Sequence, residues 1–255
     1  ESFDQSLANW DISNVYTMIN MFGDYGGFLP QSSGLSISNY DVTLIGWSGR
    51  TLQSSVTFDA GTSRYCDSEA QRSSIISTFS WTINDEGNAC PNPDAFIMRV
   101  KTDNQGTTGD TQFLVPASTL DYVYNYNVDC NNDGTPEHTS QTGNVTCNYG
   151  SPGEYEIAIS GTYPQMINSD KDADKILDVF HWGNIEWQNM SYMFHGADYM
   201  QISAADTPNL TSVLSMERMF YDTGLFNSNI ESWDVSGITS VKGMFASAMS
   251  FNQPL

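Results

Sequence analysis

A short hydrophobic pattern recurs near both ends of the 255-residue chain and ends each time in Met-Phe. In each copy, apolar residues stand at positions i, i+3, i+6 and i+7, a spacing that places four side chains on one face of a short helix. Ser13 and Ser236 lie two residues before the first apolar position, where a side-chain oxygen can cap free N–H groups. The four sets are Val15, Met18, Met21 and Phe22; Trp187, Met190, Met193 and Phe194; Val213, Met216, Met219 and Phe220; and Ile238, Val241, Met244 and Phe245.

The pattern belongs to a longer repeat of about 25 residues. Residues 3–13 read FDQSLANWDIS and residues 226–236 read FNSNIESWDVS, and Met244 follows Met219 by 25 positions. The Trp-Asp-Ile or Trp-Asp-Val segment fits a very short strand. One short strand and a few helical turns cannot bury a core alone, so we expect neighbouring repeats to stack and the Met-Phe positions to form their shared core.

These motifs resemble the repeats of the BspA family of bacterial surface proteins, a leucine-rich-repeat-like group. The likeness covers residues 1 to about 50 and about 185 to 255, and it rests on Trp-Asp-hydrophobic-Ser and Met-Phe at fixed offsets. It implies a solenoid of short helices and short strands in a surface-exposed or secreted bacterial protein. It also implies a role in adhesion and no catalytic residues.

The middle of the chain changes to a period of two, with strand-like segments between Phe96 and Ser160. The string from Tyr126 to Thr135, followed by Gly153-Glu-Tyr155, resembles the polycystic-kidney-disease (PKD) type immunoglobulin-like domain, with Cys130 in place of the usual tryptophan. We therefore expect an α+β chain. Residues 1–90 would be the end and cap of a first repeat array, 91–168 a small PKD-like β-sandwich, and 169–255 the cap and first repeats of a second array.

The chain has four cysteines, none in a C-x-x-C pair, and only three histidines, which argues against a zinc site. Sequence proximity favours the disulfides Cys66–Cys90 and Cys130–Cys147, and the alternative is four reduced, buried thiols. Few lysines and many Asn, Ser and Thr residues favour the oxidised form. The sequence thus predicts an extracellular or bacterial cell-surface location.

One loop has the spacing of a calcium site. Its oxygen-bearing residues alternate before and after Gly134, but position twelve of the loop is Ser140 and not the bidentate Glu of an EF-hand. Two interpretations stay open: a weak calcium site, or a turn that its own Asx side chains stabilise. The candidate ligands are Asp129, Asn131, Asp133, Thr135 and Glu137. A second acidic run, residues 170–175, predicts a solvated turn.

Charge and motifs narrow the function. Nine Lys and Arg against 30 Asp and Glu give a net charge of −21, which opposes binding of nucleic acid. No apolar run is long enough for direct membrane insertion, and no catalytic signature appears. We expect a non-enzymatic segment of a large adhesin that presents its repeat face to a protein or a glycan, with no cofactor unless calcium binds. The alternative is a structural subunit or spacer of an extracellular filament or stalk that contacts copies of itself.

Overall fold

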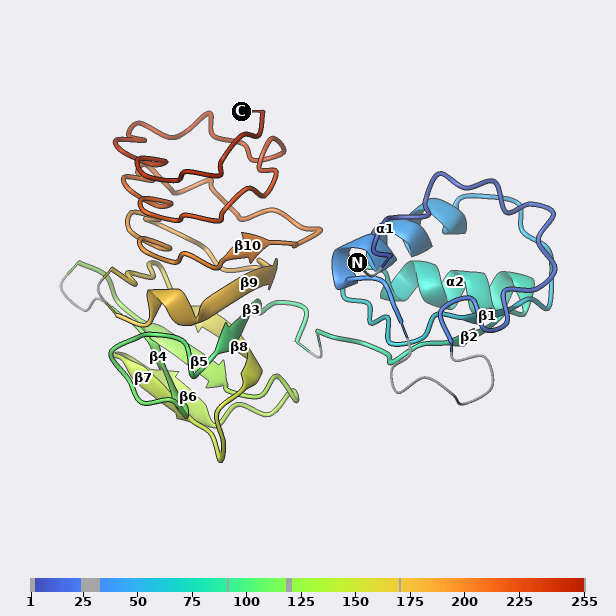
Figure 1. The fold of residues 1–255 in the computed structure, drawn as a ribbon, viewed down its shortest axis with the longest axis horizontal. Helices are drawn as coiled ribbons and strands as arrows, with labels where there is room; N and C mark the ends of the chain where they lie inside the picture. The colour runs from blue at the N-terminus through green and yellow to red at the C-terminus, as the bar shows by residue number, and fades with distance from the viewer. Residues whose placement is uncertain (1–2, 24–32, 91, 118–120, 170, 255) are drawn as a thin grey trace. The chain divides into compact units, whose positions relative to one another are not determined.

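The computed structural model describes residues 3–23, 33–90, 92–117, 121–169 and 171–254 (Figure 1). The chain divides into two compact units, Glu1–Cys90 and Pro91–Leu255. Each unit is described by itself. A search of the described residues finds no helix with the length and apolar character needed to cross a membrane.

The first unit, hereafter unit 1, packs two helices beside short parallel strands. The helices α1 (Ile37–Ser48) and α2 (Glu69–Phe79) contact each other, and β1 (Thr57–Asp59) pairs in parallel with β2 (Thr82–Asn84). A parallel bridge between Met18 and Phe58 adds the N-terminal segment as a third layer. Tyr40, Leu44 and Trp47 are fully buried. Their spacing puts them on one face of α1, so this face forms the core of the unit.

A buried carboxylate joins the two helices. Asp41 of α1 is fully buried, and its oxygens accept hydrogen bonds from the N–H groups of Cys66, Asp67 and Ser68 at 3.1 Å and from the Ser68 hydroxyl at 2.6 Å. It therefore satisfies donors at the start of α2 that no helical carbonyl can reach. Burial raises the pKa of Asp41, and the hydrogen bonds from Ser68, Asp67 and Cys66 oppose that rise.

The second unit, unit 2, contains a mixed six-stranded sheet and a two-stranded sheet. The order of the large sheet is β10-β9-β3-β8-β5-β6, in which β10 runs parallel to β9 and the other pairs are antiparallel. The strands are β3 (Phe96–Lys101), β4 (Gln112–Val115), β5 (Asn125–Asp129), β6 (His138–Gln141), β7 (Val145–Asn148), β8 (Glu154–Thr162), β9 (Ile176–His181) and β10 (Gln201–Ile202). The small sheet pairs β4 with β7, and both sheets contribute to one hydrophobic cluster.

The chain after β9 winds into a stack of turns that continues from the edge of the large sheet (Figure 1). We call residues 185–254 the C-terminal stack. N–H groups at alternate positions of one layer donate to carbonyls 24 or 25 residues further along. The pairs are Met190 to Ser215, Tyr192 to Glu217, Phe194 to Met219 and Gly196 to Tyr221, and then Met216 to Ser240, Arg218 to Lys242, Phe220 to Met244 and Asp222 to Ala246.

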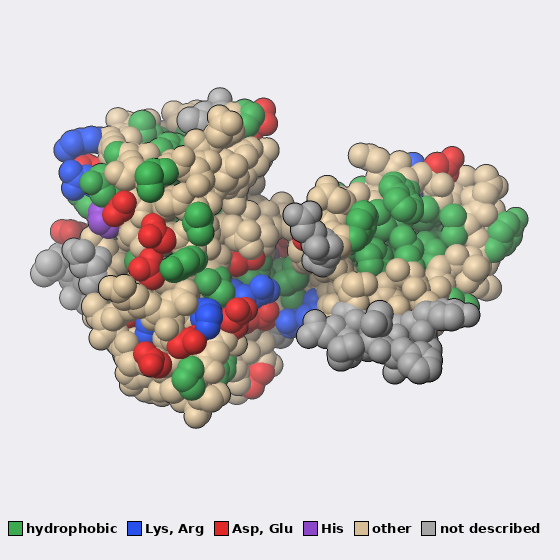
Figure 2. Space-filling view, in the orientation of Figure 1, with side chains coloured by type: hydrophobic (Ala, Val, Ile, Leu, Met, Phe, Trp, Pro, Cys, Tyr) green, Lys and Arg blue, Asp and Glu red, His purple; other side chains and the backbone are tan. Residues whose placement is uncertain are grey.

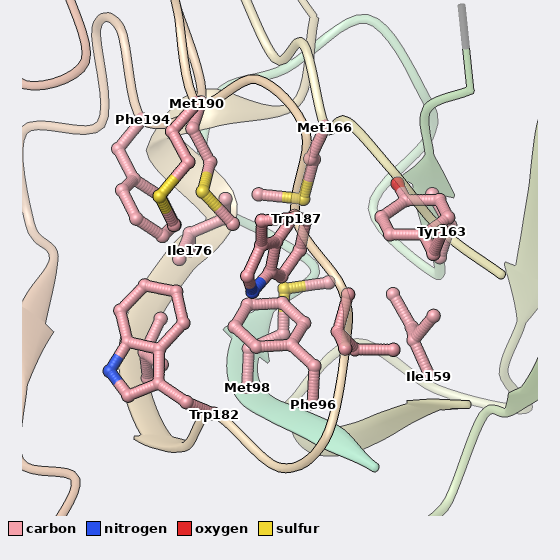
Figure 3. Close-up of a cluster of buried hydrophobic side chains, with 14 of the residues drawn as sticks. Phe96, Met98, Ile159, Tyr163, Met166, Ile176, Trp182, Trp187, Met190 and Phe194 are labelled. Carbon is pink, nitrogen blue, oxygen red and sulfur yellow. The ribbon is translucent and has the colours of Figure 1, made fainter. Parts of the chain in front are cut away.

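Aromatic rings continue this register through the interior. The ring centroids of Phe194 and Phe220 lie 5.8 Å apart, and those of Phe220 and Phe245 lie 5.6 Å apart, with nearly parallel planes. At the base of the stack, Trp187 meets Phe96 of β3 edge to face, with centroids 5.3 Å apart (Figure 3). The sheets and the stack therefore share one core.

The expected fold class is wrong. The described repeat segments contain turns and isolated bridges, both α-helices of the described residues lie between Ile37 and Phe79, and no leucine-rich-repeat-like solenoid of short helices is present. Apolar positions three residues apart suit a helix, but here the backbone N–H groups are used between layers. A helix would need the same N–H groups for carbonyls four residues earlier, so the two structures exclude each other.

The expected small all-β sandwich is also not a separate body. Strand β9 pairs with β3 and β10 extends β9, so residues after 168 enlarge the same sheet. Residues 91–168 and 169–255 consequently lie in one compact unit.

Candidate functional site

The predicted repeat-core residues line the interior of the layers, with some exceptions at the outer layers. Trp187, Met190, Met193 and Phe194 are fully buried, as are Val213, Met216, Met219 and Phe220. In the last layer Met244 is buried, Ile238 and Phe245 are half-buried, and Val241 is 56% exposed. In unit 1, Met18 and Phe22 are buried, whereas Val15 and Met21 are only partly so.

The structure pairs the cysteines as sequence proximity favours. Cys66–Cys90 closes unit 1, and Cys130–Cys147 connects the end of β5 to β7, so the second bridge links the large sheet to the small one. No free cysteine remains among the described residues. Two disulfides fit an extracellular protein.

The predicted calcium loop is held by its own hydrogen bonds. One carboxylate oxygen of Asp129 accepts from the N–H groups of Asn131 and Asp133, and the other accepts from the N–H of Gly134 at 2.7 Å. Glu137 accepts from the N–H of Cys130 at 2.7 Å. The bonds to Asp129 are those of an Asx-stabilised turn.

The loop does not gather a compact set of charged ligands. The Asp133 carboxylate accepts from the N–H of Thr135 at 2.9 Å and so also takes part in the turn. Among the described residues, no set of three His, Cys, Asp or Glu ligand atoms within 4.8 Å of one another comes from this loop. The turn interpretation explains the hydrogen bonds of Asp129 and Asp133, and calcium binding stays a prediction.

The second acidic run is a buried polar cluster and not the expected solvated turn. Asp172 is fully buried and Lys175 is 1% exposed, while Asp170 lies outside the described residues. Asp172 accepts from the N–H groups of Thr107, Thr108 and Leu114 at 2.8–3.0 Å and from both threonine hydroxyls.

Lys175 completes this cluster from the other side. Its Nζ donates to the carbonyls of Thr108, Gly109 and Gln112 at 2.9–3.1 Å and to the Thr108 hydroxyl. The two side chains therefore fix the loop between β3 and β4. This loop forms one wall of a surface pocket described next.

A pocket of about 350 Å³ opens where this loop meets the C-terminal stack. Burial lowers the pKa of the Lys171 amine. Burial, together with the charges of Asp198 and Asp222, raises the pKa of Asp174, although a hydrogen bond from the N–H of Asp198 opposes the rise. The lining residues are Gln105, Gly106, Thr107, Lys171, Ala173, Asp174, His195, Gly196 and Asp222. The pocket is thus lined by an amine, which can donate hydrogen bonds, and by carboxyl groups, which can accept them.

A column of rings rises from this pocket along the outside of the stack. The rings of His195 and Tyr221 stack at 4.9 Å with an angle of 6° between their planes. The guanidinium of Arg218 lies over the rings of Tyr192 and Tyr221, 5.8 and 5.6 Å from their centroids, and donates to the Tyr192 hydroxyl. We call Tyr192, His195, Arg218 and Tyr221 the ring column.

Basic groups are concentrated near the ring column, although the chain is strongly acidic. Lys242 forms an ion pair with Glu217 at 3.2 Å in the adjacent layers. Figure 2 shows Lys and Arg side chains gathered with a histidine at one edge of the stack. The sequence did not reveal this surface. Tyr192 and Arg218 occupy the same position of successive repeats, but they are residues of different types, so the repeat pattern does not mark this position. Aligning the polar positions on Met-Phe would have placed them in one column.

Comparison with known families identifies the repeat-bearing segments. One family model, described as "Mycoplasma protein of unknown function, DUF285", matches residues 1–83 and 165–255, which is more than half of the chain. The expected membership of the BspA family is therefore wrong, and nothing found supports the PKD resemblance of the middle segment. Neither the curated proteins nor the solved structures include a match to this chain. The chain belongs to the DUF285 family of Mycoplasma proteins of unknown function.

Proposed function

We propose that this protein is a non-enzymatic, extracellular binding protein, a segment of a larger adhesin, and that its ligand is a glycan held by the ring column and the pocket below it. The observation that carries the proposal is the placement of the half-buried rings of the column beside a pocket lined by Lys171, Asp174 and Asp222. Aromatic side chains give a sugar ring apolar contact area, while nearby polar groups bind its hydroxyls.

The charges of the pocket suit a polar ligand. Burial lowers the pKa of Lys171 and raises the pKa of Asp174. For both groups, therefore, the change from the charged to the neutral form costs less free energy in the pocket than in water. The rigid polar cluster of Asp172 and Lys175 holds the facing loop in place, so the pocket is largely formed before a ligand arrives. Preformed sites bind with a smaller loss of conformational entropy.

A binding role also agrees with the positions of the histidines. His181 is 3% exposed and its Nδ1 lies 2.8 Å from the carbonyl oxygen of Ala95, which is a structural contact. His138 lies in β6, and His195 is stacked in the ring column. These three residues belong to separate elements, so they support no shared acid–base machinery.

The test is binding of the purified chain to an array of immobilised neutral and acidic oligosaccharides. Tyr221→Ala and Arg218→Ala should reduce binding at least tenfold. Tyr199→Ala is the matched control, because Tyr199 is 54% exposed on the same stack but lies outside the column, and it should leave binding unchanged. Equal loss in all three variants, or no binding by the native chain, refutes the proposal. Release of free sugar from a bound oligosaccharide would show an enzyme instead.

A further inference from the structure

Two cations at the pocket and the ring column have no carboxylate partner. Lys171 lines the pocket, and the guanidinium of Arg218 lies over the rings of the column, yet neither forms an ion pair with any described residue. The other exposed or half-buried cations of unit 2 each have such a partner in this strongly acidic chain. These pairs are Arg99 with Glu156, Lys101 with Asp103 and Lys242 with Glu217.

The amine of Lys171 is set apart from the carboxylates of the same pocket. Asp174 and Asp222 also line the hollow, but neither forms an ion pair with the amine. Burial lowers the pKa of Lys171, and no nearby carboxylate offsets that shift. A cation that has lost part of its water and has no counter-ion is stabilised by an anion that arrives with a ligand.

The backbone ties Lys171 to the layer that carries the first ring of the column. The N–H of Lys171 donates to the carbonyl of Asn168 at 3.1 Å, and the N–H of Asn168, which is fully buried, donates to the carbonyl of Tyr192 at 3.3 Å. The facing loop is fixed as well, because a Cβ atom on Gly106 would lie 2.5 Å from Oδ1 of Asp172. The cation and the rings are therefore in place before a ligand binds.

Arg218 supplies the second cation, on the column. Its Nη1 donates to the Tyr192 hydroxyl at 3.3 Å, and its other side-chain donors have no acceptor among the described residues. The guanidinium lies over the ring of Tyr221, which stacks on His195, and His195 lines the pocket. A guanidinium can bind a carboxylate through two parallel hydrogen bonds. The pocket and the column thus each present one cation to the same ligand.

We propose that the glycan bound here is acidic and that its carboxylates pair with Lys171 and Arg218. This inference rests on the proposed function, because it assigns the charge of the ligand at that same site. Hydroxyl groups of the sugar bound at Lys171 donate to the carboxylates of Asp174 and Asp222, which line the same pocket. The ion pair and the hydroxyl contacts together fix the orientation of this sugar. A neutral sugar would leave the amine of Lys171 without a counter-ion.

The charge preference is tested with oligosaccharides that differ only in the acid group. A panel of uronic-acid oligosaccharides is measured beside the same compounds with every carboxylate reduced to a neutral alcohol. The native chain should bind at least one acidic member about tenfold more tightly than its reduced form, because hydrogen bonds to ionised groups are the stronger ones. If neutral sugars bind and no acidic member is preferred, this inference fails and the proposed function stands. If no sugar of either kind binds, the proposed function itself fails.

Variants of Lys171 test which group recognises the acid. Lys171→Gln should reduce the preference for the acidic form from about tenfold to less than about threefold, and Lys171→Arg should retain it, since arginine keeps the positive charge. Lys101→Gln is the matched control and should keep the full preference, because Lys101 pairs with Asp103 and does not line the pocket. Circular dichroism checks that all three variants fold. A preference that Lys171→Gln leaves intact, or that Lys101→Gln also removes, overturns the proposal.

Discussion

Asp172→Asn is the sharpest test of the buried polar cluster in unit 2. The native carboxylate accepts through one oxygen from the N–H groups of Thr107 and Thr108, and through the other from the N–H of Leu114 and the Thr108 hydroxyl. In the asparagine variant one oxygen becomes an NH₂ group. That group cannot accept, so either the N–H of Leu114 or the N–H groups of Thr107 and Thr108 lose their partner, and Lys175 loses a nearby opposite charge.

The expected loss follows from these contacts. An unsatisfied buried N–H costs about 1–3 kcal/mol, and a buried charge whose partner is removed adds to that cost. We therefore expect Asp172→Asn to lower the free energy of unfolding of unit 2 by about 3 kcal/mol. Asp103→Asn is the control, since its carboxylate is exposed and its ion pair is with Lys101, the last residue of β3. It should leave the stability unchanged.

The assay is urea unfolding with the disulfides intact, read by amide hydrogen exchange in peptides that contain Thr108 and Leu114. Burial alone would raise the pKa of Asp172, but hydrogen bonds from Thr108 and Leu114 and the charge of Lys175 hold it below its usual value. A lowered pKa gives stability that is present above the unfolded pKa of about 3.9 and is lost as the pH falls through the folded value. The difference in the free energy of unfolding between the native chain and Asp172→Asn should therefore become smaller as the pH falls. A loss below about 1 kcal/mol at pH 7, with both amides still protected, refutes this account.

Three further predictions concern other buried groups. Burial raises the pKa of Asp178, although hydrogen bonds from Ser203 oppose the rise. The free energy of unfolding should therefore decline as the pH rises from about 4 through the folded pKa. In urea titrations Asp178→Asn should flatten this decline and should not lower the free energy of unfolding at pH 7. A loss at pH 7 as large as that of Asp172→Asn would contradict it. Replacing Cys130 and Cys147 by serine should lower the free energy of unfolding by about 3 kcal/mol, because the loop in the unfolded chain is released; an unchanged urea midpoint would count against this. Asp129→Asn should lower the thermal midpoint equally in calcium and in EDTA, since its carboxylate accepts hydrogen bonds within the turn. If calcium instead raises the midpoint of the native chain and not that of the variant, the loop is a metal site.

Some features follow from local spacing in the sequence. Residues such as Met190, Met193 and Phe194 recur at fixed offsets because every layer places the same positions in the interior, so their burial can be inferred from the repeat alone. The same is true of Cys66 with Cys90 and Cys130 with Cys147, where nearness along the chain limits the pairing. In each case one short segment contains all the information.

Other features depend on partners that are distant in sequence. The apolar spacing of Val213 and Met216 suits both a helix and a stacked turn, and hydrogen bonds to residues 24 or 25 positions away decide between them. Asp172 and Lys175 look like residues of a solvated turn until the loop between β3 and β4, more than 60 residues earlier, closes over them. The ring column arises in the same way, because only the stacking of layers brings Tyr192, Arg218 and Tyr221 together. The sequence by itself determined the repeat, its buried positions and the disulfides. The tertiary structure decided how the backbone groups pair and which polar side chains meet. These features depend on the free energy of contacts between segments that lie far apart in the chain, so no single segment determines them.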